Sequence, residues 1–177
     1  VADVDAQPRD YPLAVLAQTS DGTMHNFDAV VTIASANYVR ANFDVPPNLA
    51  FLIDPQIERN EYARLDAIIE GRELERYWDE AGFKLPTTEP YTARFGDYRI
   101  LNQTVQTRHT GWDQSAPPGT SVAAMAGGTV AFAGHLDIRG NYIVINHGWG
   151  VYTGYAHLSQ INVERGQTIT AGQIVGL

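Results

Sequence analysis

Hydrophobic residues in the first third of the chain form short runs separated by turn residues. The runs are 13–16, 29–33 and 49–53, and they are interrupted by the turn sequence SDGT and by Pro46-Pro47. Short apolar runs bounded by Gly, Pro, Asn, Asp and Ser are typical of β-strands. The pattern predicts three or four strands in this region.

The pattern changes to helical spacing after Asp54-Pro55. Asp is a favoured N-cap residue and Pro is favoured at the first helical position, so a helix is predicted to begin here. Apolar residues then recur at helical spacing, at Tyr62, Leu65, Ile68 and Ile69, and continue at Leu74, Tyr77 and Trp78. We expect an amphipathic helix that ends near Gly82. The mixed charges of its other face indicate a solvated surface without chemistry.

From Phe83 onward, Gly and Pro punctuate short strand-like segments at 129–133, 142–146, 151–157 and 168–175. This density of Gly with short β-runs predicts a compact antiparallel sheet. The predicted fold class is therefore α+β, mostly β. An antiparallel-sheet domain at 83–177 follows a β-rich region at 1–82, which ends in the amphipathic helix.

Composition excludes several classes of protein. The 177 residues are 44% hydrophobic and 18% charged, as in an ordinary globular protein. No apolar run reaches the roughly 18 residues of a membrane span. The net charge is −8 and the 12 Lys and Arg form no basic cluster, which argues against nucleic acid as a partner. Cysteine is absent, so a thiol nucleophile, a Cys-based zinc site and disulfides are excluded.

His109 and Asp113 form a His-x-x-x-Asp pattern that could bind a metal. Four residues of extended strand would separate them by about 13 Å, so the chain must bend for both to reach one ion, and Gly111 makes such a bend easy. Zinc accepts both an imidazole nitrogen and a carboxylate oxygen. The pattern alone is weak, because a chance pair would more often be a surface hydrogen bond.

His157 lies in a segment where side chains should alternate between the faces of a strand. Tyr155, His157 and Ser159 are expected on one face, and Leu158 on the other, packed inward. A histidine on a rigid strand suits general acid–base catalysis. On spacing alone, a partly exposed structural histidine is the favoured interpretation.

The other histidines have simpler interpretations. We expect His25 and His135 at the surface and His147 in support of a turn, with an incidental metal contact as the alternative for His135 and His147. The chain contains no GxSxG, no phosphate-binding Gly loop and no HExxH motif. A carrier domain is disfavoured because no Lys follows Lys84.

An ordered set of segments resembles the lysostaphin/LytM-type zinc metallopeptidases, which cut peptidoglycan. The segments are FKLPTTEPYTARFGDYR, RHTGWD, GTSVAAMAGGTVAFAG, GNYIVINHGWGVYTGYAHLS and VERGQTITAGQIVG, all within 83–177. The resemblance implies that His109 and Asp113 bind zinc and that His157 is catalytic. Trp112 and Gln114 depart from the family pattern, which could alter the groove without removing the ligands.

The family also has a His-x-His motif, whose second histidine is the third zinc ligand. No His follows His157 in this sequence. Because the chain starts at Val1 and stops at Leu177 within an apolar stretch, we expect a piece of a longer protein that is truncated before this motif. Such a piece should bind zinc weakly and lack activity.

Two functions remain open. The first is a zinc-dependent endopeptidase that hydrolyses peptide bonds of bacterial peptidoglycan. The alternative is a non-catalytic LytM-like module that binds the cell wall or activates a hydrolase. The resemblance implies an extracellular or cell-envelope location and peptidoglycan peptides as partners. Residues 1–82 resemble the region that precedes the peptidase domain in some extracellular members, and no activity is assigned to them.

Overall fold

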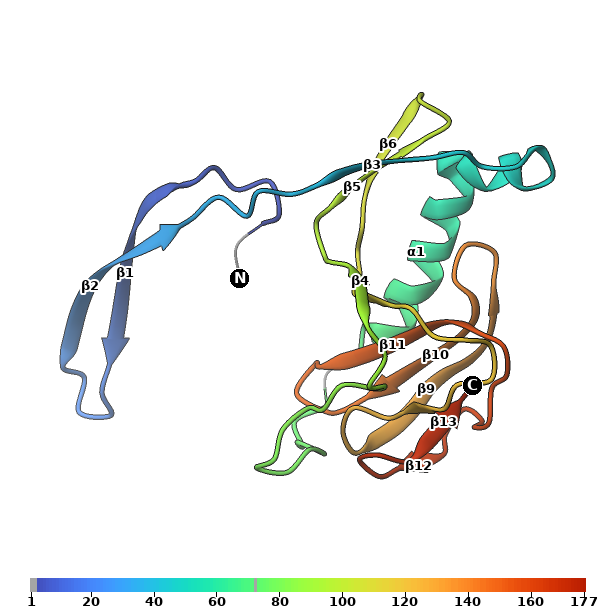
Figure 1. The fold of residues 1–177 in the computed structure, drawn as a ribbon. Coiled ribbons are helices and arrows are strands. Elements are labelled where there is room, and N and C mark those ends of the chain that lie inside the picture. The colour runs from blue at the N-terminus through green and yellow to red at the C-terminus, as the bar shows by residue number, and fades with distance from the viewer. Residues whose placement is uncertain (1–2, 72) are drawn as a thin grey trace.

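The computed structural model describes residues 3–71 and 73–177, and Figure 1 shows their arrangement. The first part holds β1 (Arg9–Gln18), β2 (Met24–Ile33), β3 (Arg40–Phe43), the 3-10 helix η1 (Pro47–Ile53) and α1 (Pro55–Ile69). The second part begins with short strands: β4 (Tyr91–Ala93), β5 (Tyr98–Leu101), β6 (Val105–Arg108), β7 (Asp113–Gln114) and β8 (Val122–Ala123). It ends with β9 (Gly128–Leu136), β10 (Gly140–Asn146), β11 (Tyr152–Leu158), β12 (Thr168–Ile169) and β13 (Ile174–Gly176).

The centre of the molecule is an antiparallel sheet with the strand order β11-β10-β9-β12. Its strands form where the sequence predicts them, because each is a short apolar run bounded by turns. The predicted segment 168–175 is divided into β12 and β13 by a turn at Gly172, whose φ is +80°. The predicted fold class, mostly β with antiparallel sheets, is confirmed.

The two faces of this sheet bury separate apolar clusters. One contains Val130, Ile143 and Ile145 together with residues of β12 and β13. The other contains Phe132, Leu136 and Val144, which pack against Leu65 of α1. Helix α1 thus covers one face of the sheet, which ties the first part of the chain to the second (Figure 1).

Helix α1 begins as predicted but ends earlier. The Asp54 carboxylate accepts a hydrogen bond from the Gln56 amide at 2.8 Å, and Pro55 is the first helical residue. The predicted continuation to Gly82 is wrong, since the helix ends at Ile69. Of the apolar residues beyond it, Leu74 is 92% exposed, whereas Trp78 meets Trp149 edge-on. The Tyr77 amide donates a hydrogen bond to the His147 carbonyl at 2.8 Å.

The predicted strand at 49–53 is also wrong. Residues 47–53 form η1, with Pro46 at its N-cap and Pro47 in its first turn. Proline has no amide proton for a strand ladder but fits the first turn of a helix, and this explains the difference.

A parallel pairing joins the two predicted domains. Strand β3 pairs with β5 in parallel, with Ala41 opposite Arg99, and β5 pairs in turn with β6. The division near residue 82 stays a prediction. Backbone hydrogen bonds and the α1 contact both cross it.

Strands β1 and β2 form a ribbon that extends away from the rest of the molecule (Figure 1). Its register places Tyr11 opposite Val31 and Val15 opposite Phe27, so these apolar side chains share one face. Phe27 is 58% exposed. Leu16 and Val30 on the opposite face are exposed as well, so both faces of the ribbon present apolar side chains to solvent.

The N-cap of α1 gives a test of the fold. Asp54→Ala removes the acceptor of the Gln56 amide and should lower the free energy of unfolding by about 1 kcal/mol, measured by urea denaturation. Asp66→Ala, which removes an exposed carboxylate from the interior of the same helix, is the control and should change stability by less. Equal losses in both variants would contradict a capping role for Asp54.

Candidate active site

His109 is held in one orientation by its surroundings. It directly follows β6, is buried, and its backbone amide donates to the Asp97 carbonyl at 2.8 Å. Its Nδ1 lies 2.9 Å from the Arg94 carbonyl oxygen. A carbonyl oxygen can only accept, so Nδ1 carries the proton and Nε2 has a free lone pair. This tautomer leaves Nε2 available for a metal.

Asp113, the first residue of β7, meets this nitrogen. Its Oδ1 lies 3.0 Å from His109 Nε2, so the prediction that the two side chains lie close together is confirmed. The chain bends at Gly111 as expected, although Gly111 lacks the positive φ that only glycine adopts readily. A Cβ there would be 3.6 Å from His109 Nε2, an ordinary contact, so the bend itself does not require glycine.

Arg99 holds the second oxygen of Asp113, a contact that the sequence analysis missed. Its Nη2 lies 2.5 Å from Asp113 Oδ2, and its guanidinium lies 5.8 Å from the centre of the Phe43 ring of β3. Asp113 is 42% exposed, so it would otherwise be free to rotate. The sequence indicates that Arg99 and Leu101 share one face of β5, because side chains alternate along a strand. It does not indicate that β5 lies near Asp113, because that proximity follows from the pairing of β5 with β6.

His157 faces the same cavity as His109 and Asp113, as predicted, but not by simple alternation. Tyr155 and Leu158 are both buried, whereas strict alternation would place them on opposite faces. A β-bulge opposite Tyr142 explains the difference, because residues 156 and 157 together face one residue of β10. His157 adopts φ +57°, in the left-handed region, and its side chain is exposed.

The shared cavity has a volume of about 850 Å³. It is lined by residues of β6, β7 and β11 and, from the first part of the chain, by η1 and α1, including Leu52, Glu58 and Tyr62. Arg99 and Arg139 also line it. The cavity therefore combines the His–Asp pair, a solvent-accessible histidine and cationic groups, a set of groups suited to binding and hydrolysing a polar substrate.

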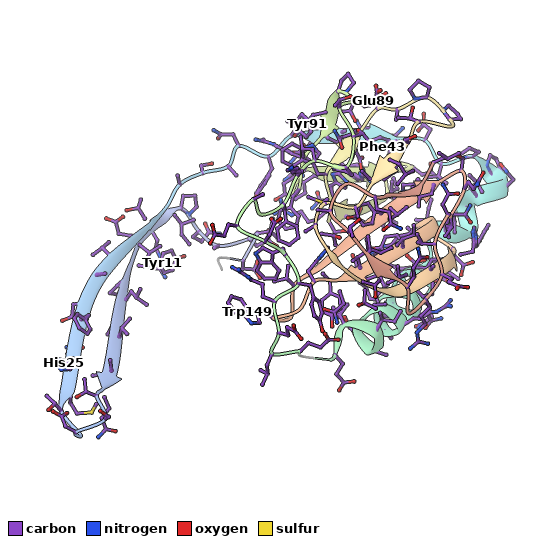
Figure 2. All side chains as sticks on the ribbon, turned by 90° about the horizontal axis from the view of Figure 1, so that it is seen from below. Tyr11, His25, Phe43, Glu89, Tyr91 and Trp149 are labelled. Carbon is purple, nitrogen blue, oxygen red and sulfur yellow. The ribbon has the colours of Figure 1, made fainter. Side chains whose placement is uncertain are left out.

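The two residues that depart from the family pattern lie at the rim. Trp112 is 62% exposed and meets Tyr91 edge-on at 5.1 Å between ring centres. Gln114 Nε2 donates to the Glu89 carbonyl at 2.9 Å. Figure 2 labels Tyr91 and Glu89, which lie near each other at this edge. The polar Gln114 thus fixes the segment before β4, while His109 Nε2 and Asp113 Oδ1 lie 3.0 Å apart.

The remaining histidines lie outside the cavity. His25 is on the extended ribbon, far from the site (Figure 2), and His135 is exposed on β9, 3.3 Å from Asn141 Oδ1. His147 is fully buried at the end of β10. Its Nδ1 lies 2.7 Å from the Gly127 carbonyl and its Nε2 lies 2.8 Å from Thr153 Oγ1, so it supports the turn between β10 and β11. Within residues 3–71 and 73–177, His, Cys, Asp and Glu form no group of three or more suited to a metal.

Comparison with known proteins shows what the region around this site is similar to. Residues 107–177 match the model of peptidase family M23. The match contains His109, Asp113 and His157, and the predicted resemblance to LytM-type metallopeptidases is confirmed. These residues are called the M23 segment below.

Individual relatives match mainly this segment. The chain is 42% identical over 69 residues to peptidoglycan DD-endopeptidase ShyA of Vibrio cholerae, covering 39% of this chain and 16% of that protein. It is 43% identical over 68 residues to DD-carboxypeptidase/endopeptidase Mpg of Neisseria meningitidis, covering 38% of this chain and 16% of that protein. The chain thus spans less than a fifth of these curated relatives.

One solved structure is similar in fold to the first part of the chain as well. A Pseudomonas aeruginosa protein described as an M23 peptidase aligns with a TM-score of 0.64 and 21% identity, covering 97% of this chain and 61% of that one. The first part of the chain therefore shares its fold with that protein. Separately, no helix within the described residues is long and apolar enough to cross a membrane.

Burial of His147 predicts a dependence of stability on pH. Burial lowers the pKa of His147 below its ordinary value near 6.5, although the hydrogen bond to Gly127 opposes the shift. The unfolded chain therefore binds a proton at a higher pH than the folded one. The stabilisation is complete above about pH 6.5 and is lost as pH falls through 6.5 toward the folded-state pKa.

We expect the free energy of unfolding to fall between pH 7.5 and 5.5, and His147→Gln should reduce that slope. Chemical denaturation across this range measures it. His135→Gln, which replaces an exposed histidine of the same sheet, should leave the slope unchanged. A slope unaffected by His147→Gln would assign the pH dependence to other groups.

Proposed function

We propose that this protein is a zinc-dependent endopeptidase that hydrolyses peptide bonds of bacterial peptidoglycan. The observation that carries the proposal is the convergence of His109, Asp113 and His157 on one cavity within the M23 segment. The names of the relatives ShyA and Mpg support a peptidoglycan peptide as the substrate. The same substrate implies an extracellular or cell-envelope location.

The donor atoms fit zinc. Ligands that each lie about 2.0–2.2 Å from one tetrahedral ion are roughly 3.5 Å apart, so the observed 3.0 Å between His109 Nε2 and Asp113 Oδ1 requires only a small adjustment. His109 Nδ1 is occupied by the Arg94 carbonyl and Asp113 Oδ2 by Arg99, so the two remaining donor atoms point at one place.

Each of these residues would have a separate role in hydrolysis. The chemistry supplied by a bound zinc ion is Lewis acidity at the scissile carbonyl and activation of the attacking water. His109 and Asp113 would hold the ion through Nε2 and Oδ1. His157, exposed to the cavity, would transfer a proton and stabilise the developing oxyanion. The walls formed by η1 and α1 would orient the peptide.

The proposal requires a further ligand. Catalytic zinc sites generally use three protein ligands, and residues 1–177 contribute His109 and Asp113. The histidines of this sequence lie at positions 25, 109, 135, 147 and 157, so none forms a His-x-His pair. In the family that the chain resembles, the second His of such a motif completes the set. The test therefore needs the product of the whole gene.

The decisive experiment digests purified peptidoglycan with the whole gene product and separates the released peptides by chromatography. We expect cleavage that a chelator abolishes and zinc restores. His109→Ala and Asp113→Ala should each abolish it, and His157→Ala should lower the rate about 10²- to 10⁴-fold. His135→Ala is the matched control and should cleave normally.

Residues 1–177 alone should bind zinc at least 10-fold more weakly than the whole product and should not cleave. Equal zinc-dependent cleavage by both would make His135 or His147 the next candidate ligand. A whole product that binds zinc and peptidoglycan but cleaves nothing would replace the proposal with the non-catalytic module.

Arg99 provides a separate test of the metal pair. Arg99→Gln frees Asp113 to rotate, so zinc affinity should fall about 10-fold, measured by competition with a chelating dye. Arg40→Gln alters an exposed arginine of the same small sheet that contacts Gln106 instead, and should have little effect. Unchanged affinity in Arg99→Gln would show that Asp113 keeps its orientation without this contact.

A further inference from the structure

Glu61 is a buried carboxylate that the proposed chemistry does not use. It lies on α1, outside the M23 segment, and its side chain is only 3% exposed. Burying a carboxylate is unfavourable unless it is paired and hydrogen-bonded. Its partners therefore indicate what it does.

Both partners lie on the turn between β9 and β10. Glu61 Oε2 accepts a hydrogen bond from the Ile138 amide at 2.8 Å, and Oε1 forms an ion pair with the Arg139 guanidinium. Arg139 also lies over the Tyr62 ring, 4.8 Å from its centre. One side chain of α1 thus holds two consecutive residues of the turn, one by its backbone and the other by its side chain.

The same turn holds His157. The Arg139 carbonyl accepts a hydrogen bond from the His157 amide at 2.9 Å. This is the residue that the bulge places in the left-handed region, where a side chain other than that of glycine is strained. On the other side of the bulge, Asn141 Nδ2 donates to the Leu158 carbonyl at 3.0 Å. Surrounding contacts must maintain such a conformation, and the Arg139 carbonyl supplies one of them.

Stability alone is a weak explanation for the ion pair. Replacing a buried pair by apolar residues of similar volume is often neutral or stabilising. What an apolar contact would not supply is the direction of the turn, because only an acceptor at Glu61 can fix both the Ile138 amide and the Arg139 side chain. That direction sets where the Arg139 carbonyl points.

We propose that Glu61 is a positioning residue for His157 and acts through Arg139. The proposal rests on the catalytic role proposed for His157. Helix α1, besides walling the cavity, then sets the position of the proton-transfer group. His109, directly after β6, and Asp113, on β7, do not contact Glu61, so the proposed metal site should be independent of this link.

The test uses Glu61→Gln, which keeps the shape and an acceptor for the Ile138 amide but removes the charge. Arg139→Lys is the second variant, and it keeps the charge and the carbonyl. Glu70→Gln, an exposed change at the end of the same helix, is the control. Amide hydrogen exchange by NMR is measured at His157 and, within the sheet, at Val144.

In Glu61→Gln, exchange at His157 should accelerate at least 10-fold while Val144 keeps its rate, with a smaller acceleration in Arg139→Lys and none in Glu70→Gln. In the whole gene product, kcat should fall about 10-fold in Glu61→Gln while zinc affinity stays within 2-fold of wild type.

Unchanged exchange at His157 in both variants would overturn the proposal. So would equal acceleration at His157 and Val144, because it would indicate general loosening of the sheet. Hydrogen exchange needs no activity, so it tests the link even if wild type fails to cleave peptidoglycan. Failure of the proposed function would appear instead as absent cleavage by wild type.

Discussion

Strand β10 hydrogen-bonds to β9 on one side and to β11 on the other, and its residues Ile143 and Ile145 are fully buried. This pairing fixes the register of β11 against the core. Because Tyr155 and Leu158 must both be buried, the two residues between them are forced into a bulge. The exposure of His157 to the cavity follows from that packing requirement, so the core determines where the proposed catalytic group lies.

The His109–Asp113 pair depends on shorter-range constraints. His109 and Asp113 are close in sequence, and a local bend is enough to bring them together. Their orientation, however, is set by residues earlier in the sequence. The Arg94 carbonyl fixes the tautomer of His109, and Arg99 fixes the carboxylate of Asp113. Hydrogen bonds that orient a metal ligand commonly decide how tightly a metal is held.

The division between local and long-range constraints also explains what could be predicted from the sequence. The start of α1 was predictable because an N-cap and a proline act locally, and the strands of the central sheet were predictable from their apolar runs. The end of α1 was not, because Tyr77 and Trp78 continue the helical spacing of apolar residues but lie against the turn after β10. The proximity of His109 and Asp113 was predicted from the ordered set of family-like segments and the bend at Gly111, whereas their spacing alone was a weak indication. The bulge at His157 and the links from Arg99 and Glu61 join distant segments, and no spacing indicates them.

The pairing of β3 with β5 has a consequence for recombination between relatives. The residues matched by the family model begin at 107, yet β5, which carries Arg99, lies before them and takes its outer hydrogen bonds from β3. A crossover at residue 107 would join the His109–Asp113 pair of one parent to an arginine and a supporting strand from another. Hybrid proteins should therefore fold and keep this site best when residues 40–177 come from one parent. The segment that must be exchanged together is longer than the segment that is similar in sequence.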